Sequence, residues 1–329
     1  MPSLLTNKEL WAIKMKSMAT YQTDLDQTKI KGYNDTRSSR NLKKEKGLVM
    51  EIKKILVPTD FSINSTEALN SAITIAQSQG AEVIVLHVYH MPFADEHMPP
   101  SMIKELMNTQ KERAELDMQT FVESQQIFKQ KTVPVEYKTV IGFASEMILD
   151  VARANNVDLI ITSTKGANSI DDKLFGTVTW NIIKNSEIPV MAIPEKSINP
   201  VFKNIMIPFE GTEKDNDTIT WLLSFAEKNK ATVHAVHFLT DSTNYNKSTI
   251  DKLHSRFRKY LENDMLQLHF LAEKNITEGI KKFASRNNID MICMVTHHHG
   301  LFATIFHMSI TRNITLYSQI PLLAYNIDK

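Results

Sequence analysis

An internal repeat constrains the fold of this chain more than any other feature of its sequence. Four short segments of the first half recur in the same order in the second half. Residues 52–60, 83–88, 157–161 and 188–193 correspond to residues 202–210, 233–238, 289–293 and 320–325. Four matches in one order indicate that a whole domain was duplicated. We therefore expect two domains of one fold, at residues 51–196 and 201–329, after a leader at residues 1–50.

Each repeated segment is a short, nearly continuous apolar run rich in β-branched residues, as in a strand that is covered on both faces. Between these runs, residues 65–76 and 145–152 each gather apolar side chains on one helix face. Strands that alternate with helices predict an α/β fold: two Rossmann-like, doubly wound parallel-sheet domains in tandem. A longer helix is expected at residues 99–129, with a shorter counterpart between residues 240 and 266.

The first fifty residues differ in composition from the rest. They carry scattered polar residues without a sustained apolar period, and they end in a basic run at residues 40–46. The apolar region of a signal peptide does not follow their early charges. We expect this leader to be disordered. An alternative is that translation starts at Met50 and that the leader is not part of the native protein.

The charges of the chain are nearly balanced, with 38 Lys and Arg against 37 Asp and Glu and a formal charge of +1. This balance gives no electrostatic reason to expect a nucleic acid or a membrane as partner. No apolar run approaches the roughly 18 residues that a membrane span requires. The single cysteine, Cys293, excludes an internal disulfide and a cysteine-rich zinc site, and it lies in a run typical of a buried strand. A reducing, cytoplasmic location fits this composition.

Residues suited to a nucleotide site follow two predicted strands of the first domain. In a parallel sheet, ligands bind at the carboxyl ends of the strands, beside the switch point. Asp60 directly follows the first strand, where a carboxylate accepts hydrogen bonds from a ribose hydroxyl or an adenine amine. The alternative is that Asp60, Asn64 or Ser65 caps the following helix.

A second group of candidate residues follows the predicted strand at residues 157–161, which we count as the fourth strand of the domain. Gly166 lets the backbone approach a ligand closely. Gly176 and Thr177 stand at a predicted helix start, where free N–H groups and the helix dipole favour a phosphate. Lys165 either screens phosphate charge or faces solvent.

These segments resemble the universal stress protein family of the ATP-binding type. The family pattern is a strand followed by Pro-x-Asp, then Gly-x2-Gly-x9-Gly-(Ser/Thr), then a closing Ile-Pro-Val strand. In this chain the pattern reads Pro58-x-Asp60, then Ser163-x2-Gly166-x9-Gly176-Thr177, then Ile188-Pro189-Val190. The resemblance covers nearly all of residues 52–327 as two copies. It implies the adenine nucleotide alpha hydrolase-like form of the Rossmann fold.

The resemblance also implies which residues bind the nucleotide. It implies base and ribose contacts from Pro58, Asp60, Val88 and Thr162, and phosphate contacts from Gly166, Gly176, Thr177 and Val178. Ser163 stands where the family has its first glycine. A Cβ at that place either blocks the ligand or is accommodated, depending on the backbone φ. The implied ligand is ATP or another adenine nucleotide, with or without Mg.

The second domain keeps the nine-residue spacing of the late motif but has lost its glycines. Val295, His298 and Met308-Ser309 stand against Ser163, Gly166 and Gly176-Thr177, and Glu210 stands against Asp60. We therefore expect a degenerate site that does not bind nucleotide. The histidines at 297–299, with His307, raise the alternative of a metal site. No carboxylate or cysteine is suitably spaced beside them, so we expect no metal.

The favoured hypothesis is a nucleotide-binding regulatory protein of the stress response that senses ATP or AMP without turning it over. The sequence has no Walker lysine motif. One alternative is an enzyme that slowly hydrolyses ATP, phosphorylates itself or transfers adenylyl groups; another is a nucleotide-free interaction scaffold. In the family the closing strands pair across a dimer, which implies an intrachain pseudo-dimer of the two domains here. A homodimer and a protein partner of unknown identity are further expectations.

Overall fold

The structure of the chain is a computed structural model, which describes residues 51–90, 98–125, 133–165, 176–195, 202–210, 213–239, 247–296 and 320–326. The predicted leader and Gly166 lie outside these residues. The histidines at 297–299 and 307 lie outside them as well.

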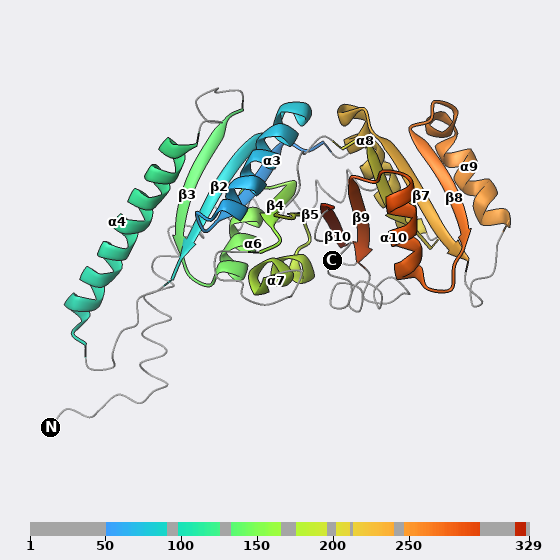
Figure 1. The fold of residues 1–329 in the computed structure, drawn as a ribbon. Coiled ribbons are helices and arrows are strands. Elements are labelled where there is room, and N and C mark those ends of the chain that lie inside the picture. The colour runs from blue at the N-terminus through green and yellow to red at the C-terminus, as the bar shows by residue number, and fades with distance from the viewer. Residues whose placement is uncertain are drawn as a thin grey trace. The chain divides into compact units, whose positions relative to one another are not determined.

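Strands and helices alternate along both halves, as the sequence predicts (Figure 1). The first half contains β1 (Lys54–Thr59), α3 (Ile63–Gln79), β2 (Glu82–Tyr89), α4 (Pro100–Ser124), β3 (Val135–Ile141), α6 (Ala144–Ala154), β4 (Leu159–Ser163), α7 (Thr177–Asn185) and β5 (Val190–Ile193). The second half contains β6 (Asn204–Pro208), α8 (Glu213–Asn229), β7 (Thr232–Leu239), α9 (Lys247–Glu262), β8 (Leu266–Ala272), α10 (Ile276–Arg286), β9 (Met291–Thr296) and β10 (Leu322–Asn326).

The strands form one continuous sheet in the order β3-β2-β1-β4-β5-β10-β9-β6-β7-β8. All neighbours within each half are parallel, which confirms the predicted doubly wound fold. The two halves meet where β5 and β10 pair antiparallel, with Met191 opposite Leu323. The closing strands therefore pair within the chain, as expected for a pseudo-dimer.

Helices cover both faces of the sheet, which explains why the strands are apolar at nearly every position. In β1, Ile55 and Val57 lie in the core layer that contains α3, whereas Leu56 lies in the layer that contains α6 and α7. All three side chains are fully buried. Burial of each contributes roughly 1.5–3 kcal/mol. Cys293 is buried in β9 in the same way, and burial raises the pKa of its thiol.

The core layer that contains α3 continues into the second half of the chain. Leu69 of α3 and Leu222 and Phe225 of α8 belong to one buried cluster. Polar contacts connect the same two helices, because Gln79 Nε2 donates to Phe225 O at 3.4 Å and Lys228 Nζ donates to Gln79 O at 3.1 Å. The two halves thus share one core.

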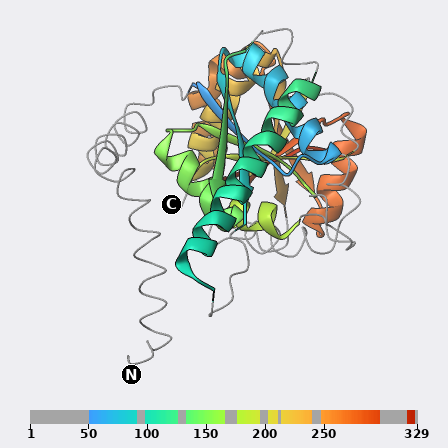
Figure 2. The same cartoon turned by 90° about the vertical axis from the view of Figure 1, so that its left-hand side faces the viewer.

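The helix expected at residues 99–129 is α4, which has 25 residues against 16 in its counterpart α9. It begins with Pro100, since a missing N–H costs nothing in a first helical turn. Its side chains Ala114, Met118 and Phe121 are buried, whereas Met102 near the other end is 53% exposed. Figures 1 and 2 show α4 as the outermost element at the β3 end of the sheet.

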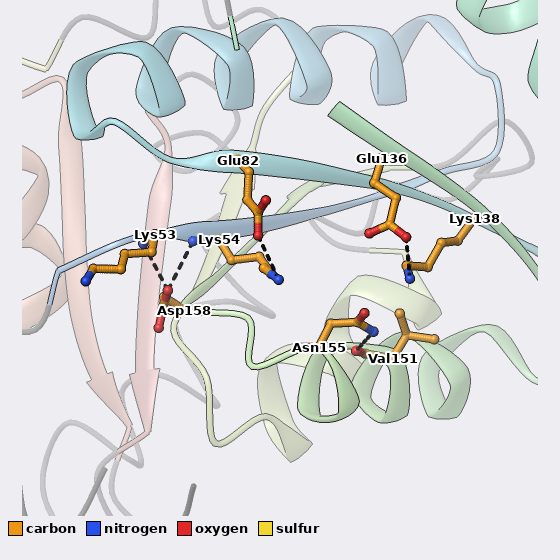
Figure 3. A network of polar contacts seen from close by, with 8 residues as sticks. All are labelled: Lys53, Lys54, Glu82, Glu136, Lys138, Val151, Asn155 and Asp158. Atoms are coloured by element: carbon orange, nitrogen blue, oxygen red, sulfur yellow. Dashed lines mark hydrogen bonds and ion pairs between the residues drawn. The ribbon is translucent and has the colours of Figure 1, made fainter. Parts of the chain in front are cut away.

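The aspartate that precedes the fourth strand of each half has a structural role. Asp158 Oδ2 accepts hydrogen bonds from the backbone N–H groups of Lys53 and Lys54, at 2.9 and 3.1 Å (Figure 3). Asp290 accepts from the equivalent groups of Lys203 and Asn204. Each aspartate joins the start of the strand that follows it, β4 or β9, to the start of the first strand of its half, β1 or β6. This role accounts for the recurrence of the aspartate in the repeat.

The two halves differ on the face of the sheet that lies beside this aspartate. The first half carries the ion pairs Lys54–Glu82 and Lys138–Glu136, both at 2.7 Å (Figure 3). At the positions equivalent to Ile84 and Lys138, the second half has His234 and His269. Their atoms Nδ1 and Nε2 lie 3.2 Å apart.

The pair formed by the buried His234 and the partly buried His269 is neutral at physiological pH. Burial and, to a smaller extent, the neighbouring His269 together lower the pKa of His234 to about 4. Burial also lowers the pKa of His269. Asn204 Nδ2 donates to Asn288 O, so Asn204 Oδ1 is the acceptor for His234 Nε2–H at 3.4 Å. His234 Nδ1 then accepts a hydrogen bond from His269 Nε2–H.

Candidate functional site

The strand order brings three predicted site residues to one edge of the sheet. β1 pairs with β2 on one side and with β4 on the other, all parallel, so their carboxyl ends lie together. Val88 is the penultimate residue of β2, Asp60 follows β1 and Thr162 is the penultimate residue of β4. Neighbouring strands are about 4.8 Å apart. This edge is the switch point at which parallel sheets bind ligands.

The turn after β1 holds Asp60 at this edge. Asp60 is exposed, and its Oδ1 accepts hydrogen bonds from Ser62 N at 3.2 Å and Ser62 Oγ at 2.6 Å. The N-cap of α3 is Ser62, whose hydroxyl accepts from Ser65 N. The alternative that Asp60, Asn64 or Ser65 caps this helix is therefore wrong. Pro58 lies two residues earlier in β1 and is half-buried.

Phe61 and His87 complete the turn, and the sequence pattern does not predict that their rings meet. Phe61 has a left-handed φ of 63°, and its ring stacks on His87 with 4.2 Å between the ring centroids. His87 Nδ1–H donates to Thr59 O at 2.9 Å. The sequence contains one signal for a positive φ at this position. The residue of the second half that is equivalent to Phe61 is Gly211, and glycine favours a positive φ.

The end of β4 accommodates a serine where the family pattern has glycine. Ser163 is buried, and its φ does not fall among the positive values found in the described residues. Its hydroxyl donates to Lys165 O at 2.9 Å, and its carbonyl accepts from Thr179 Oγ1 at 2.8 Å. The Cβ therefore causes no left-handed strain, and the side chain turns back into its own loop. Of the predicted residues that follow it, Gly166 lies outside the described residues.

The helix α7 starts directly after Gly176, as predicted. Gly176 is the N-cap, and its N–H donates to Thr164 O at 2.8 Å. Its φ of −63° suits any residue, so the backbone conformation at this position does not require glycine. As a glycine, this N-cap has no side chain that could accept from the first-turn N–H groups. Thr177 and Val178 are exposed in its first turn, where helix N–H groups and the dipole attract anions.

The equivalent turn of the second half is held differently. Glu210 N donates to Asp215 Oδ2 at 3.1 Å, and Asp215 is only 2% exposed although its counterpart in the first half is Ser65. Phe209 and Val295 are buried beside this edge. The remaining residues of the predicted degenerate site, His298, Met308 and Ser309, lie outside the described residues.

Within the described ranges, no three His, Cys, Asp or Glu side chains are grouped so that they could hold a metal ion. No helix in the same ranges combines the length and apolarity that crossing a membrane requires.

Known proteins resemble the chain over both halves. The profile of the universal stress protein family matches residues 51–194 and 202–326. Universal stress protein MJ0531 of Methanocaldococcus jannaschii is 30% identical over 144 residues, which cover 43% of this chain and 81% of that protein. A solved universal stress protein from Archaeoglobus fulgidus is 17% identical and covers 84% of this chain and 99% of its own, with a TM-score of 0.65. A universal stress protein solved in complex with cAMP is 19% identical and covers 44% of this chain and 98% of its own, with a TM-score of 0.34.

Proposed function

The chain belongs to the universal stress protein family, with two copies of the family domain in tandem, and on this premise we propose that its first copy binds an adenine nucleotide such as ATP or AMP. The binding serves regulation in a stress response, by sensing the nucleotide rather than turning it over. The second copy supplies structure and does not bind nucleotide.

One observation carries the proposal: Asp60 and the N-terminus of α7 follow adjacent parallel strands of one sheet edge. β1 and β4 are hydrogen-bonded parallel neighbours, so the segments that follow them start at the same edge of the sheet. The Asp60 carboxylate suits a ribose hydroxyl, and the N–H groups of the first turn of α7, whose N-cap residue is a glycine, suit a phosphate. A nucleotide carries both groups, since its ribose is linked directly to the phosphates.

The conformation of Ser163 supports the same proposal. A serine in place of the first family glycine would oppose binding if its side chain occupied the path of the ligand. Its hydroxyl instead donates to Lys165 O within its own loop. The backbone at this position does not need the positive φ that only glycine adopts readily.

The hydrogen bonds of Asp60 support sensing rather than turnover. Its Oδ1 accepts two hydrogen bonds from Ser62, which hold the carboxylate as a fixed acceptor. A general base must reach the proton that it abstracts. The other residues proposed for the site contribute backbone N–H groups and hydroxyls, which bind and orient a ligand.

The test compares matched variants of the two copies. We expect isothermal titration calorimetry of the full chain to show ATP binding, and Asp60→Ala to weaken it by about tenfold or more, because a charge-assisted hydrogen bond is lost. Glu210→Ala removes the equivalent carboxylate of the second copy and should leave the affinity unchanged. AMP and cAMP, titrated in parallel, separate the contribution of the base from that of the triphosphate.

Mass spectrometry of the denatured protein gives an independent measure. A co-purified adenine nucleotide in wild type that is absent from Asp60→Ala is the expected result. Absence of any nucleotide, together with no heat on titration with ATP, AMP or cAMP, would contradict the proposal and favour the nucleotide-free scaffold. Release of phosphate or pyrophosphate in a single turnover would favour the enzyme instead.

A further inference from the structure

Phe61 adopts a backbone conformation that aromatic residues rarely adopt. Its φ is 63°, and it is the only aromatic residue with a positive φ in the described part of the chain. The other non-glycine residues with positive φ are Asn156, Lys230, Asp264 and Asn288. A bulky residue persists in this region only when its surroundings hold it there, and such strain gathers at functional sites.

The surroundings that hold Phe61 come from three elements. Its backbone N–H donates to Thr59 Oγ1 of β1 at 3.0 Å. Its ring stacks on His87 of β2 and lies against Phe121 of α4, with 4.2 and 5.3 Å between the ring centroids. His87 Nδ1–H in turn donates to Thr59 O. We call Thr59, Phe61, His87 and Phe121 the aromatic clasp.

Two members of the aromatic clasp, Thr59 and Phe61, are the sequence neighbours of Asp60, and contacts within the clasp hold both of them. Thr59 is buried at the end of β1, and Phe61 is anchored by its ring. Release of the ring would let residue 61 leave the left-handed region, and the peptide group between Asp60 and Phe61 would rotate. The direction of the Asp60 carboxylate would then change.

We propose that Phe61 is a positioning residue of the nucleotide site, whose stacking on His87 and Phe121 holds the turn that presents Asp60 to the ligand. The inference rests on the proposed function, because positioning has a purpose only if Asp60 binds nucleotide. Phe61 itself acts through the turn and need not touch the nucleotide.

A comparison with the second copy shows which contact of the aromatic clasp occurs in both copies and which occurs only in the first. His237 Nδ1 makes the same bond to the carbonyl of the preceding strand, to Phe209 O at 2.9 Å. This histidine contact is therefore common to both copies. In the second copy, however, the turn amide of Glu210 binds the Asp215 carboxylate, and the residue equivalent to Phe61 is Gly211. The stacked aromatic in the turn belongs to the copy that carries the binding residues.

The test replaces the ring while leaving the backbone free to keep its conformation. Phe61→Gly accepts a positive φ without strain but removes the stack. Phe61→Tyr keeps the ring. The matched control is Phe270→Leu, which removes a partly buried ring beside Phe209 and His237 in the second copy.

ATP affinity of the full chain is measured by calorimetry, and stability by urea unfolding. We expect Phe61→Gly to bind ATP about tenfold more weakly or worse, because the turn is no longer preorganised. Phe61→Tyr should bind as wild type does, and Phe270→Leu should bind ATP normally whatever its stability. Hydrogen exchange should rise in Phe61→Gly at residues 60–62, with the rest of the core still protected.

Each other outcome overturns the inference. Equal affinity of Phe61→Gly and wild type would remove the positioning role and leave the proposed function intact. Equal losses in Phe61→Gly and Phe270→Leu would indicate a general effect of lost packing. If wild type itself binds no ATP, the proposed function and the inference fail together.

Discussion

At the scale of single residues, the His234–His269 pair makes the stability of the second half sensitive to acid. Burial and the neighbouring imidazole lower the pKa of His234 from 6.5 to about 4, so the folded protein binds fewer protons than the unfolded chain between these values. Stability is therefore lost as the pH falls from about 6.5 towards 4. His234→Ile copies the first half, which has Ile84 at this position.

We expect His234→Ile to lose less stability in acid than wild type does. Between pH 7 and pH 4.5 the loss should be about 2–3 kcal/mol smaller, since one pKa unit corresponds to about 1.4 kcal/mol. Urea unfolding as a function of pH measures this difference. Asp290 acts in the opposite sense because burial raises its pKa, and it is present in both proteins, so it cancels in the comparison. Parallel pH profiles of the two proteins would contradict the assignment.

At the scale of elements, the start of α3 depends on one hydroxyl. Ser62 Oγ accepts from Ser65 N, and Asp60 Oδ1 accepts from the Ser62 hydroxyl. Ser62→Ala should lower the free energy of unfolding by about 1 kcal/mol, as expected for loss of an N-cap, and Ser62→Asn should restore most of it. Thermal unfolding measures both effects. Asn64→Ala is the control. A larger loss of stability in Asn64→Ala than in Ser62→Ala would contradict the assignment of Ser62 as the N-cap.

At the scale of the whole molecule, the shared core predicts that both halves unfold together. β5 and β10 pair antiparallel, and buried residues of both halves form common clusters. Leu323→Ala, at a fully buried position opposite Met191, should lower the free energy of unfolding by about 2–5 kcal/mol.

Native-state hydrogen exchange measures which strands lose amide protection in Leu323→Ala. Protection should fall by the same amount in β1 and in β7, although Leu323 lies in neither strand. Leu116→Ala on α4 is the control, because this side chain is 61% exposed and should change neither strand. A loss of protection confined to the second half would show that the halves unfold separately.

The sequence predicted most of the strands and helices because their signals are local, whereas β3 and β8 were not among the predicted strand segments. Continuous apolar runs mark strands that are buried on both faces, and the four repeated runs placed both copies of the fold. The helix start at Gly176 was also predicted, since a glycine before a helical pattern is a local signal. The contacts of the site were predicted less well, because they depend on side chains that come together from different strands.

By itself, the sequence determined that this protein is a tandem α/β repeat and which residues stand at the carboxyl ends of its strands, since period and order are properties of neighbouring residues. Only the tertiary structure decided that Ser62 rather than Asp60 caps α3, that the Ser163 side chain turns back to Lys165, and that Phe61 takes a left-handed turn. Each of these outcomes is a competition among several hydrogen-bonding or packing partners. The partner that wins is set by contacts between segments far apart in the chain, which local patterns do not record.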